Sequence, residues 1–200
     1  MSRLEETLAM DRRRFLRASL AGGAVLLAGG GMLASRVRAA ASTPVGQPGK
    51  VLLEIFDDHG RDLGAREVPR LVLTDAQWRQ RLPPASYDIM RREGTERAFS
   101  GEHERPAVAG LFRCRACDTA LYDAAAEFDS GTGWPSFWQP IARRNVVEQI
   151  DHLFGMTRTA ISCRGCDSHL GHVFDDGPQP TGLRYCMNSV ALRFVARTES

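Results

Sequence analysis

One cysteine differs from the other four in its spacing along the chain. Cys186 has no second cysteine close to it, whereas the others form two C-x-x-C pairs. Period-2 alternation after a turn predicts a strand on which Arg184, Cys186 and Asn188 share one face. A guanidinium beside a thiol favours the thiolate, which is the reactive form. Spacing alone leaves two interpretations open: a reactive nucleophile, or an inert free thiol in a hydrophobic strand.

The two C-x-x-C pairs, Cys114/Cys117 and Cys163/Cys166, predict a metal site. Each pair can lie on a tight turn that directs two sulfurs at one ion, and four such thiolates form a tetrahedral zinc site. The alternative is two disulfides, which an oxidising compartment would allow. Disulfides at this close spacing tend to be redox-active rather than structural, so we favour one Zn²⁺. Because four thiolates close the coordination shell, this zinc should be structural.

Two further stretches carry side chains that could serve a reactive thiol. Trp134 stands beside a proline between glycine turns, a position that also suits a core aromatic residue. His169 and His172 precede an acidic turn that contains Asp176 and leads back toward Cys186. Two histidines and an aspartate could hold and protonate a substrate oxygen, but alone they could equally be surface turn residues or metal ligands. Together with the thiol, the set predicts covalent thiol catalysis.

Short strands must position these side chains. From residue 108 onward, short apolar or alternating runs are separated by Gly, Asp, Asn and Pro, which is typical of a small antiparallel β structure. The predicted strands cover residues 108–113, 146–150, 152–162, 170–174 and 183–195. The last of these would carry Cys186 and Phe194 on one face of a single strand.

Two short helices should precede the strands. Thr74 and Gln77 predict a capping box, and the helix that follows should end at two prolines, residues 83 and 84. The prolines can start a second short helix that stops at Gly94. Residues 51–56 could form a strand before a turn, but the sequence assigns them no function.

The first 41 residues predict an export signal. Paired arginines at positions 12 and 13 precede a glycine-diluted apolar core and a small-residue cleavage region, as in twin-arginine signals. We expect export to the periplasm, with an uncleaved leader anchored in the inner membrane as the lesser alternative. The leader carries seven arginines against three acidic residues, so its removal changes the formal net charge from +2 to −2. The remaining chain therefore gives no electrostatic case for binding nucleic acid.

Chain length fits one domain with an extension. We expect a signal peptide at 1–41, a linker or N-terminal extension at 42–70, and a catalytic domain at 71–200.

Four ordered motifs, together with both C-x-x-C pairs, resemble the B-type peptide-methionine (R)-S-oxide reductases. The resemblance runs from about residue 74 to residue 194 and rests on Gly133–Phe137, His169–Phe174, Asp176–Gly182 and Arg184–Ser189. It implies a mainly β fold of two antiparallel sheets, a small rolled or tent-like β domain with short N-terminal helices and a structural zinc. It also implies reduction of the R epimer of methionine sulfoxide, free or in proteins.

The same resemblance implies a role for each matching residue. Cys186 would attack the sulfoxide sulfur and be converted to a sulfenic acid. Trp134 would form the hydrophobic wall for the methyl group of the substrate, with Phe137 as a second substrate-binding residue. The residues expected around the oxygen and the thiolate are His169, His172, Asp176, Arg184 and Asn188.

One position departs from the family pattern. Many members carry a resolving cysteine between the glycines before the tryptophan, where this chain has Thr132. With the other four cysteines assigned to zinc, no thiol remains to condense with the Cys186 sulfenic acid. We therefore expect an external thiol reductant, thioredoxin-like or other.

Two rival functions use parts of the same pattern. A non-catalytic zinc-ribbon-like interaction module explains four cysteines but not Cys186, Trp134 or the histidines. A different thiol enzyme, such as a peroxidase or an acyl-transfer enzyme, lacks an evident peroxide or oxyanion-hole motif. We therefore favour the reductase.

Overall fold

The computed structural model describes residues 44–45, 49–101, 106–151 and 157–197. All of them fall in one compact unit, Ala40–Ser200. The predicted export signal at 1–41 lies outside the described residues. Within the part of the chain that is described, no helix has the length and apolar character needed to cross a membrane.

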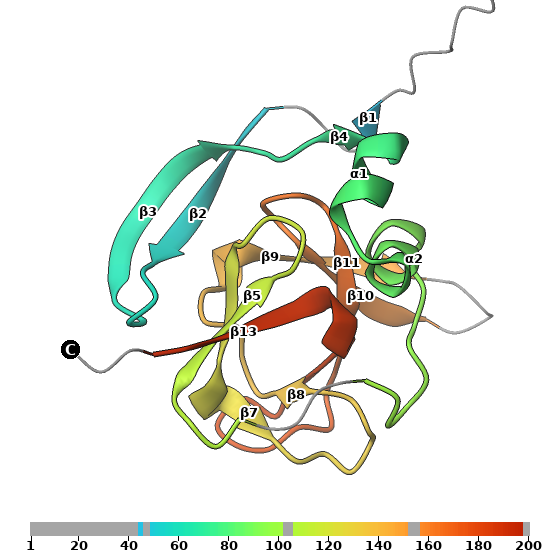
Figure 1. Cartoon of the computed structure of the whole chain (residues 1–200). Helices are drawn as coiled ribbons and strands as arrows, with labels where there is room; N and C mark the ends of the chain where they lie inside the picture. The colour runs from blue at the N-terminus through green and yellow to red at the C-terminus, as the bar shows by residue number, and fades with distance from the viewer. Residues whose placement is uncertain (1–43, 46–48, 102–105, 152–156, 198–200) are drawn as a thin grey trace, which may run out of the picture. The chain divides into compact units, whose positions relative to one another are not determined.

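Antiparallel sheets dominate the fold, as the sequence predicts (Figure 1). The largest has the strand order β7-β8-β12-β11-β10-β9. Its strands are β7 (Glu127–Phe128), β8 (Ser136–Phe137), β9 (Val146–Asp151), β10 (Arg158–Cys163), β11 (His169–Phe174) and β12 (Arg184–Met187). The second sheet has the order β13-β5-β6, formed by β5 (Gly110–Cys114), β6 (Ala120–Asp123) and β13 (Leu192–Ala196). Two strand pairs complete the described sheets: β1 (Pro44–Val45) with β4 (Leu73–Thr74), and β2 (Lys50–Phe56) with β3 (Asp62–Pro69).

Two short helices, α1 (Asp75–Arg81) and α2 (Pro84–Arg92), follow the two strand pairs and precede the two larger sheets in the chain. The capping box is confirmed, because Thr74 accepts from the Gln77 backbone and the Gln77 side chain accepts from the Thr74 backbone. Proline starts α2, and the helix ends at Glu93 in a left-handed conformation, one residue before the predicted glycine. Among the described residues, the short 3₁₀ turns η1 (Ala124–Ala126), η2 (Arg143–Asn145) and η4 (Ser189–Ala191) link strands.

The predicted strand at 183–195 is wrong as a single element. The chain forms β12, turns through η4 and continues as β13 in the other large sheet. Cys186 and Phe194 therefore lie on different sheets. The turn is stable because side chains supply its backbone partners: the Glu96 carboxylate accepts from the N–H of Ser189 at 2.6 Å. The predicted strand at 152–162 is shorter than expected, since β10 begins at Arg158 and residues 152–156 lie outside the described residues.

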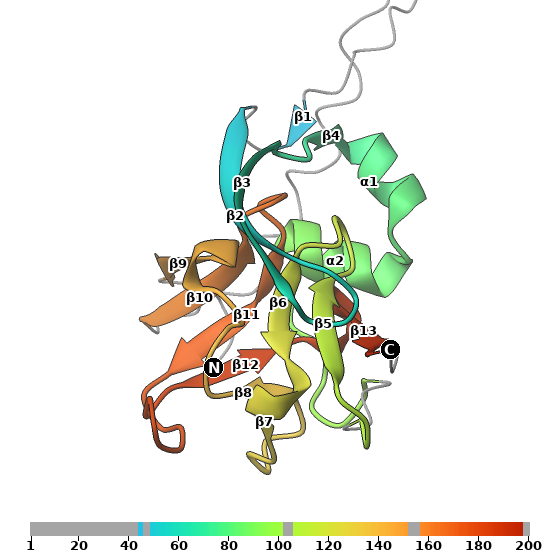
Figure 2. The same cartoon turned by 90° about the vertical axis from the view of Figure 1, so that its left-hand side faces the viewer.

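A hairpin of β2 and β3 packs beside β6 and the turn before β9 (Figure 2). It is held by Asn145, which is fully buried and whose side chain accepts from Glu54 N and donates to Glu54 O, both at 2.8 Å. Leu53 of β2 is 4% exposed. The residues 51–56 that the sequence left without a function thus form part of the packed structure.

Candidate active site and metal centre

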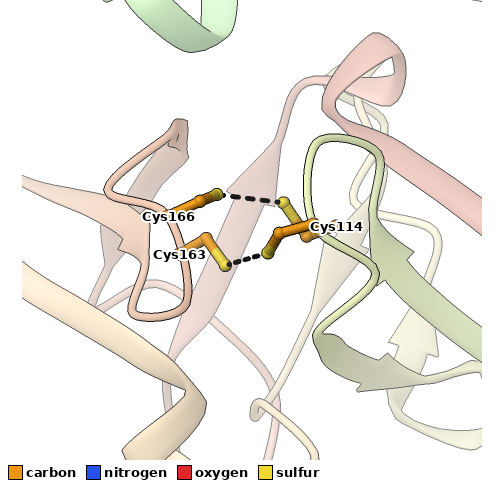
Figure 3. Close-up of side chains that lie close together, drawn as sticks. Cys114, Cys163 and Cys166 are labelled. Atoms are coloured by element: carbon orange, nitrogen blue, oxygen red, sulfur yellow. Dashed lines mark hydrogen bonds between the residues drawn. The ribbon is translucent and has the colours of Figure 1, made fainter. Parts of the chain in front are cut away.

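The four paired cysteines lie together, and Figure 3 labels three of them, Cys114, Cys163 and Cys166. One pair begins at the last residue of β5 and the other at the last residue of β10, so the two large sheets each contribute half of the cluster. All four sulfurs lie within 4.8 Å of one another. The structure therefore brings together the four predicted ligands. Cys117 faces Cys163, 46 residues later in the sequence, and Cys114 faces Cys166, 52 residues later.

The two turns are built alike. In each, the residue after the second cysteine, Asp118 or Asp167, adopts a left-handed backbone conformation and donates its N–H to the carbonyl of the first cysteine at 2.8 Å. Aspartate tolerates this conformation better than most residues. The repeated geometry directs both sulfurs of a pair to the same side of the turn, as the C-x-x-C spacing predicts.

The sulfur positions fit a tetrahedral metal ion. Metal–sulfur bonds of about 2.3 Å place tetrahedral sulfurs about 3.8 Å apart, and the Cys114–Cys166 and Cys117–Cys163 sulfurs are 3.7 and 3.5 Å apart. Three of the four cysteines are buried. Hydroxyl groups lie beside two of the sulfurs, Thr119 at 3.1 Å from Cys117 and Ser168 at 3.2 Å from Cys166. The cluster can hold one metal ion through four thiolates.

Cys186 lies in the middle of the six-stranded sheet, on β12 between β8 and β11. Its Cα partners are His172 on β11 and Ser136 on β8. Strands β11 and β12 approach closely at Gly171, where an added Cβ would lie 2.1 Å from the Cys186 carbonyl oxygen. The sheet thus places a half-buried thiol between an imidazole and a hydroxyl.

Hydroxyl groups form a short network beside the thiol. Thr132 Oγ1 lies 4.0 Å from Cys186 Sγ. Ser130 Oγ lies 2.8 Å from Thr132 Oγ1 and 2.7 Å from Ser136 Oγ. The sequence did not predict Ser130, Thr132 or Ser136 as neighbours of the thiol. It marked Thr132 only as the position where many family members carry a resolving cysteine. The only available signal was the density of small hydroxyl residues around Trp134.

Arg184 does not make Cys186 a resting thiolate. Burial raises the pKa of the Cys186 thiol, and this effect outweighs the lowering by Arg184, Thr132 and Ser136. The Arg184 guanidinium donates two hydrogen bonds to Asp176, both at 2.8 Å, and stacks on Phe174 at 4.4 Å from the ring centroid. Arg184 therefore lowers the pKa of the thiol, as the sequence predicts, but its charge is shared with a carboxylate and burial has the larger effect.

A bulge in β11 brings the two histidines together. Residues three apart on a regular strand point to opposite faces, but the β10–β11 register shifts so that Gly171 pairs with Ile161 and His169 with Ser162. The extra residue, Leu170, reverses the alternation. The ring centroids of His169 and His172 are consequently 5.2 Å apart.

Both imidazoles are held in the neutral form. Burial lowers the pKa of His169 to about 4, and burial also lowers the pKa of His172 although Asp151 opposes it. His172 Nε2 lies 3.1 Å from Asp151 Oδ2, which also accepts from Arg158 at 3.0 Å. The buried Nε2 of His169 has no hydrogen-bond partner among the described residues. Asp151 was missed from the sequence because it ends a different strand, β9, and no motif marks it.

Of the remaining predicted site residues, Trp134 lies at a turn, whereas Asn188 and Phe137 are buried. Trp134 lies at the turn before β8, where its Nε1 donates to the Glu96 carbonyl at 3.2 Å. Asn188 is buried and donates from Nδ2 to the Leu170 carbonyl at 3.0 Å. Phe137 is fully buried and stacks on Tyr122 at a centroid distance of 4.3 Å. The structure thus places Phe137 in the core, where it supports the strand that carries Ser136.

Hollows flank this arrangement. His169 and His172 line one of 280 Å³ together with Asp151, and Trp134 lines another of 380 Å³. A larger hollow of 480 Å³ opens beside Cys117 and the β2–β3 hairpin. Volume alone does not locate a reactive site.

Known proteins match this chain over the region that contains these site residues. The SelR domain family matches residues 82–196. A peptide methionine sulfoxide reductase MsrB of Thiobacillus denitrificans is 54% identical over 121 residues, which cover 60% of this chain and 92% of the relative. The protein of that name from Pseudomonas syringae pv. syringae is 49% identical over 129 residues, 64% of this chain and 98% of its own length. The chloroplastic peptide methionine sulfoxide reductase B1 of Arabidopsis thaliana is 50% identical over 125 residues, 62% of this chain and 61% of the relative.

Proposed function

The chain belongs to the SelR domain family of B-type methionine sulfoxide reductases, and from that premise we propose that it reduces methionine-R-sulfoxide with Cys186 as the nucleophile. The observation that carries the proposal is the environment of Cys186, which pairs with His172 on one neighbouring strand and Ser136 on the other. A zinc-ribbon-like interaction module, the rival interpretation, gives none of these groups a role.

The proposed step transfers one oxygen atom. The Cys186 sulfur attacks the sulfoxide sulfur, the sulfur–oxygen bond of the substrate breaks, and the oxygen passes to Cys186 as a sulfenic acid. The substrate sulfur is reduced by two electrons to the thioether, and the cysteine sulfur is oxidised by two. The proton of the resting thiol balances the reaction, because it ends on the sulfenic acid.

The Thr132 hydroxyl and His172, the Cα partner of Cys186, support this chemistry. The sulfoxide oxygen gains negative charge as its bond to sulfur breaks, so a donor within reach lowers the barrier. His169 offers a buried Nε2 that no described residue engages, and Asp151 orients His172. Since both rings are neutral at pH 7, they act as donors or relay the thiol proton. Asp176 acts through Arg184, which it holds near the thiol.

Substrate recognition is assigned to the aromatic side of the site. We propose that the Trp134 indole contacts the methyl group of the sulfoxide, and that the placement of oxygen and methyl group on opposite sides selects the R epimer. Phe137 supports this side from the core. Free and protein-bound sulfoxides present the same reacting group.

An external thiol should complete the cycle. Thr132 occupies the position of a resolving cysteine in many family members, and its hydroxyl is 4.0 Å from the Cys186 sulfur. We propose that the sulfenic acid loses water on reaction with an external thiol, and that a second thiol then releases the mixed disulfide. Mass spectrometry after oxidation by substrate alone tests this: a disulfide between Cys186 and another cysteine of the chain would contradict it.

The metal is proposed to be one structural Zn²⁺ held by Cys114, Cys117, Cys163 and Cys166. Four thiolates suit zinc and leave no open position for substrate. When bound, the ion joins the two turns and contributes to folding.

Localisation rests on the leader alone. We propose export by the twin-arginine route to the periplasm, where oxidised envelope proteins would be the substrates; retention by an uncleaved leader in the inner membrane is the alternative. Replacing Arg12 and Arg13 by Lys should hold the protein in the cytoplasm. Normal export of that variant would contradict the assignment.

One assay tests the activity. Purified protein lacking residues 1–41 is incubated with racemic methionine sulfoxide and a chemical thiol reductant, and the remaining epimers are resolved. Loss of the R epimer alone is expected. Loss of the S epimer alone, or of neither, would contradict the function, and R-specific loss that survives Cys186→Ser would contradict the mechanism.

A further inference from the structure

The segment between α2 and β5 contacts both sides of the reactive thiol. Within it, Glu96 lies three residues after the C-cap of α2 and belongs to no helix or strand. No motif in the sequence marked this residue. In the structure, its backbone and its carboxylate make five hydrogen bonds to the two segments that flank Cys186 in space.

On one side, Glu96 holds the end of the strand that carries the thiol. Its carboxylate accepts from Ser189 N at 2.6 Å, from Ser189 Oγ at 2.9 Å and from Val190 N at 3.3 Å. The two backbone donors are the first N–H groups of η4, which have no partner inside the turn. An ionised acceptor makes stronger hydrogen bonds than a neutral one, so a carboxylate suits this position.

The same contact sets the orientation of Asn188. Glu96 N donates to Asn188 Oδ1 at 2.9 Å, while Asn188 Nδ2 donates to the Leu170 carbonyl at 3.0 Å. Both ends of the amide are thus occupied, which defines the direction in which it points. Asn188 stands two residues after Cys186, so movement of the Glu96 segment would move the end of β12.

On the other side, Glu96 holds the aromatic wall. Its carbonyl accepts from Trp134 Nε1 at 3.2 Å. Three residues further along the same segment, Phe99 N donates to the Gly133 carbonyl at 2.9 Å, next to Trp134. The indole is therefore tied to a segment whose own position depends on the carboxylate anchor at Ser189 and Val190.

We infer that Glu96 is a positioning residue: its carboxylate anchors the segment that sets the distance and orientation of Trp134 and Asn188 around Cys186. This inference rests on the proposed function and adds a residue that does not touch the reacting atoms. A displacement of about 1 Å in a reactive geometry costs on the order of a hundredfold in rate. Three donors at η4 also lose their acceptor when the carboxylate is removed.

The test compares Glu96→Ala and Glu96→Gln with Glu67→Gln, a matched control on the exposed β3 strand whose carboxylate makes only a 3.8 Å ion pair with Lys50. With methionine-R-sulfoxide and a chemical reductant, Glu96→Ala should lower kcat/KM by about 100-fold. Glu96→Gln keeps one acceptor oxygen and should lower kcat/KM by about tenfold. Glu67→Gln should equal the unsubstituted protein.

A second measurement separates positioning from loss of folded protein. Glu96→Ala is combined with Trp134→Phe, which lacks the indole N–H. If Glu96 acts through Trp134, its effect on KM should largely disappear in that background, and the two substitutions should be strongly non-additive. A general loss of folded protein would lower kcat equally in both backgrounds.

Each outcome decides the inference. An unsubstituted protein without activity contradicts the proposed function, not this inference. An active protein whose Glu96→Ala variant stays within twofold in kcat/KM overturns the inference, as does full additivity with Trp134→Phe. If Glu96→Ala does not fold, Glu96→Gln carries the test, and an unchanged kcat/KM in that variant also overturns it.

Discussion

The five cysteines lie in two contrasting regions of the described structure. The cluster cysteines stand on two equivalent turns with their sulfurs directed at one point, whereas Cys186 stands on a central strand opposite His172 and Ser136. Mutual proximity of thiols suits a metal ion, because each ligand completes the shell of the others. Proximity to hydroxyl and imidazole groups suits reaction, because proton donors accompany the sulfur. The neighbours, and not the thiol itself, determine the role.

The two regions also differ in how they are supported. Around the cluster, the hairpin and the turns are joined by buried groups such as Leu53 and Asn145 and by an Arg70–Asp167 ion pair at 2.6 Å. Around Cys186, support comes from hydrogen bonds to an irregular segment, above all those of Glu96. Substitution in the first region should therefore lower stability and substitution in the second should lower activity.

Cys186→Ser should separate the two regions most clearly. A hydroxyl is a far weaker nucleophile than a thiol, so the variant should lose activity by roughly a thousandfold or more. Its metal content and midpoint of thermal unfolding should match those of the unsubstituted protein. A variant that also lost its metal would show that the two regions are not independent.

Cys114→Ser or Cys166→Ser should produce the opposite pattern. Removing one ligand from a buried cluster costs several kcal/mol of folding free energy, since metal binding and folding are coupled. We expect released zinc in a chromogenic chelator assay and a clearly lower unfolding midpoint. A stable, metal-free and fully active variant would contradict a structural metal.

The histidines should make stability depend on pH. His169 has a pKa of about 4 in the folded protein and about 6.5 when unfolded, so the unfolded state binds more protons between these values. Stability is therefore fully present above pH 6.5 and falls as the pH drops toward 4, by roughly 3 kcal/mol at most. Denaturant titrations at several pH values should show this slope, and His169→Gln should reduce it. An unchanged slope in His169→Gln would assign the effect to other groups.

The smallest expected effect on rate comes from Thr132→Cys, yet it should change the product. The 4.0 Å separation of Thr132 Oγ1 and Cys186 Sγ is short enough for a disulfide after a small shift of the loop. Oxidation by substrate alone should then link the introduced thiol to Cys186 in a disulfide, detected by mass spectrometry, with initial turnover within a fewfold of normal. Thr132→Ser is the matched control and should accumulate sulfenic acid. Absence of the linkage would mean that the loop holds position 132 away from the oxidised sulfur.

Local signals in the sequence predicted the elements that depend on neighbouring residues. The capping box at Thr74 is confirmed because its two hydrogen bonds connect residues three apart. The C-x-x-C pairs are likewise local turns, and their spacing predicted both the cluster and its four members. Strand 183–195 was mispredicted because the break at η4 depends on Glu96, more than 90 residues earlier in the chain.

By itself, the sequence determined the chemistry available to this protein: four paired thiols, one separate thiol, two histidines and a threonine at the position of a resolving cysteine. Residue types and their spacing along the chain carry that information directly. Only the tertiary structure decided which groups meet: the bulge that unites His169 and His172, Asp151 behind His172, the ion pair of Arg184 with Asp176 and the anchoring of the site by Glu96. Those contacts join residues distant in sequence, and burial sets their pKa values, so neither follows from the order of residues along the chain.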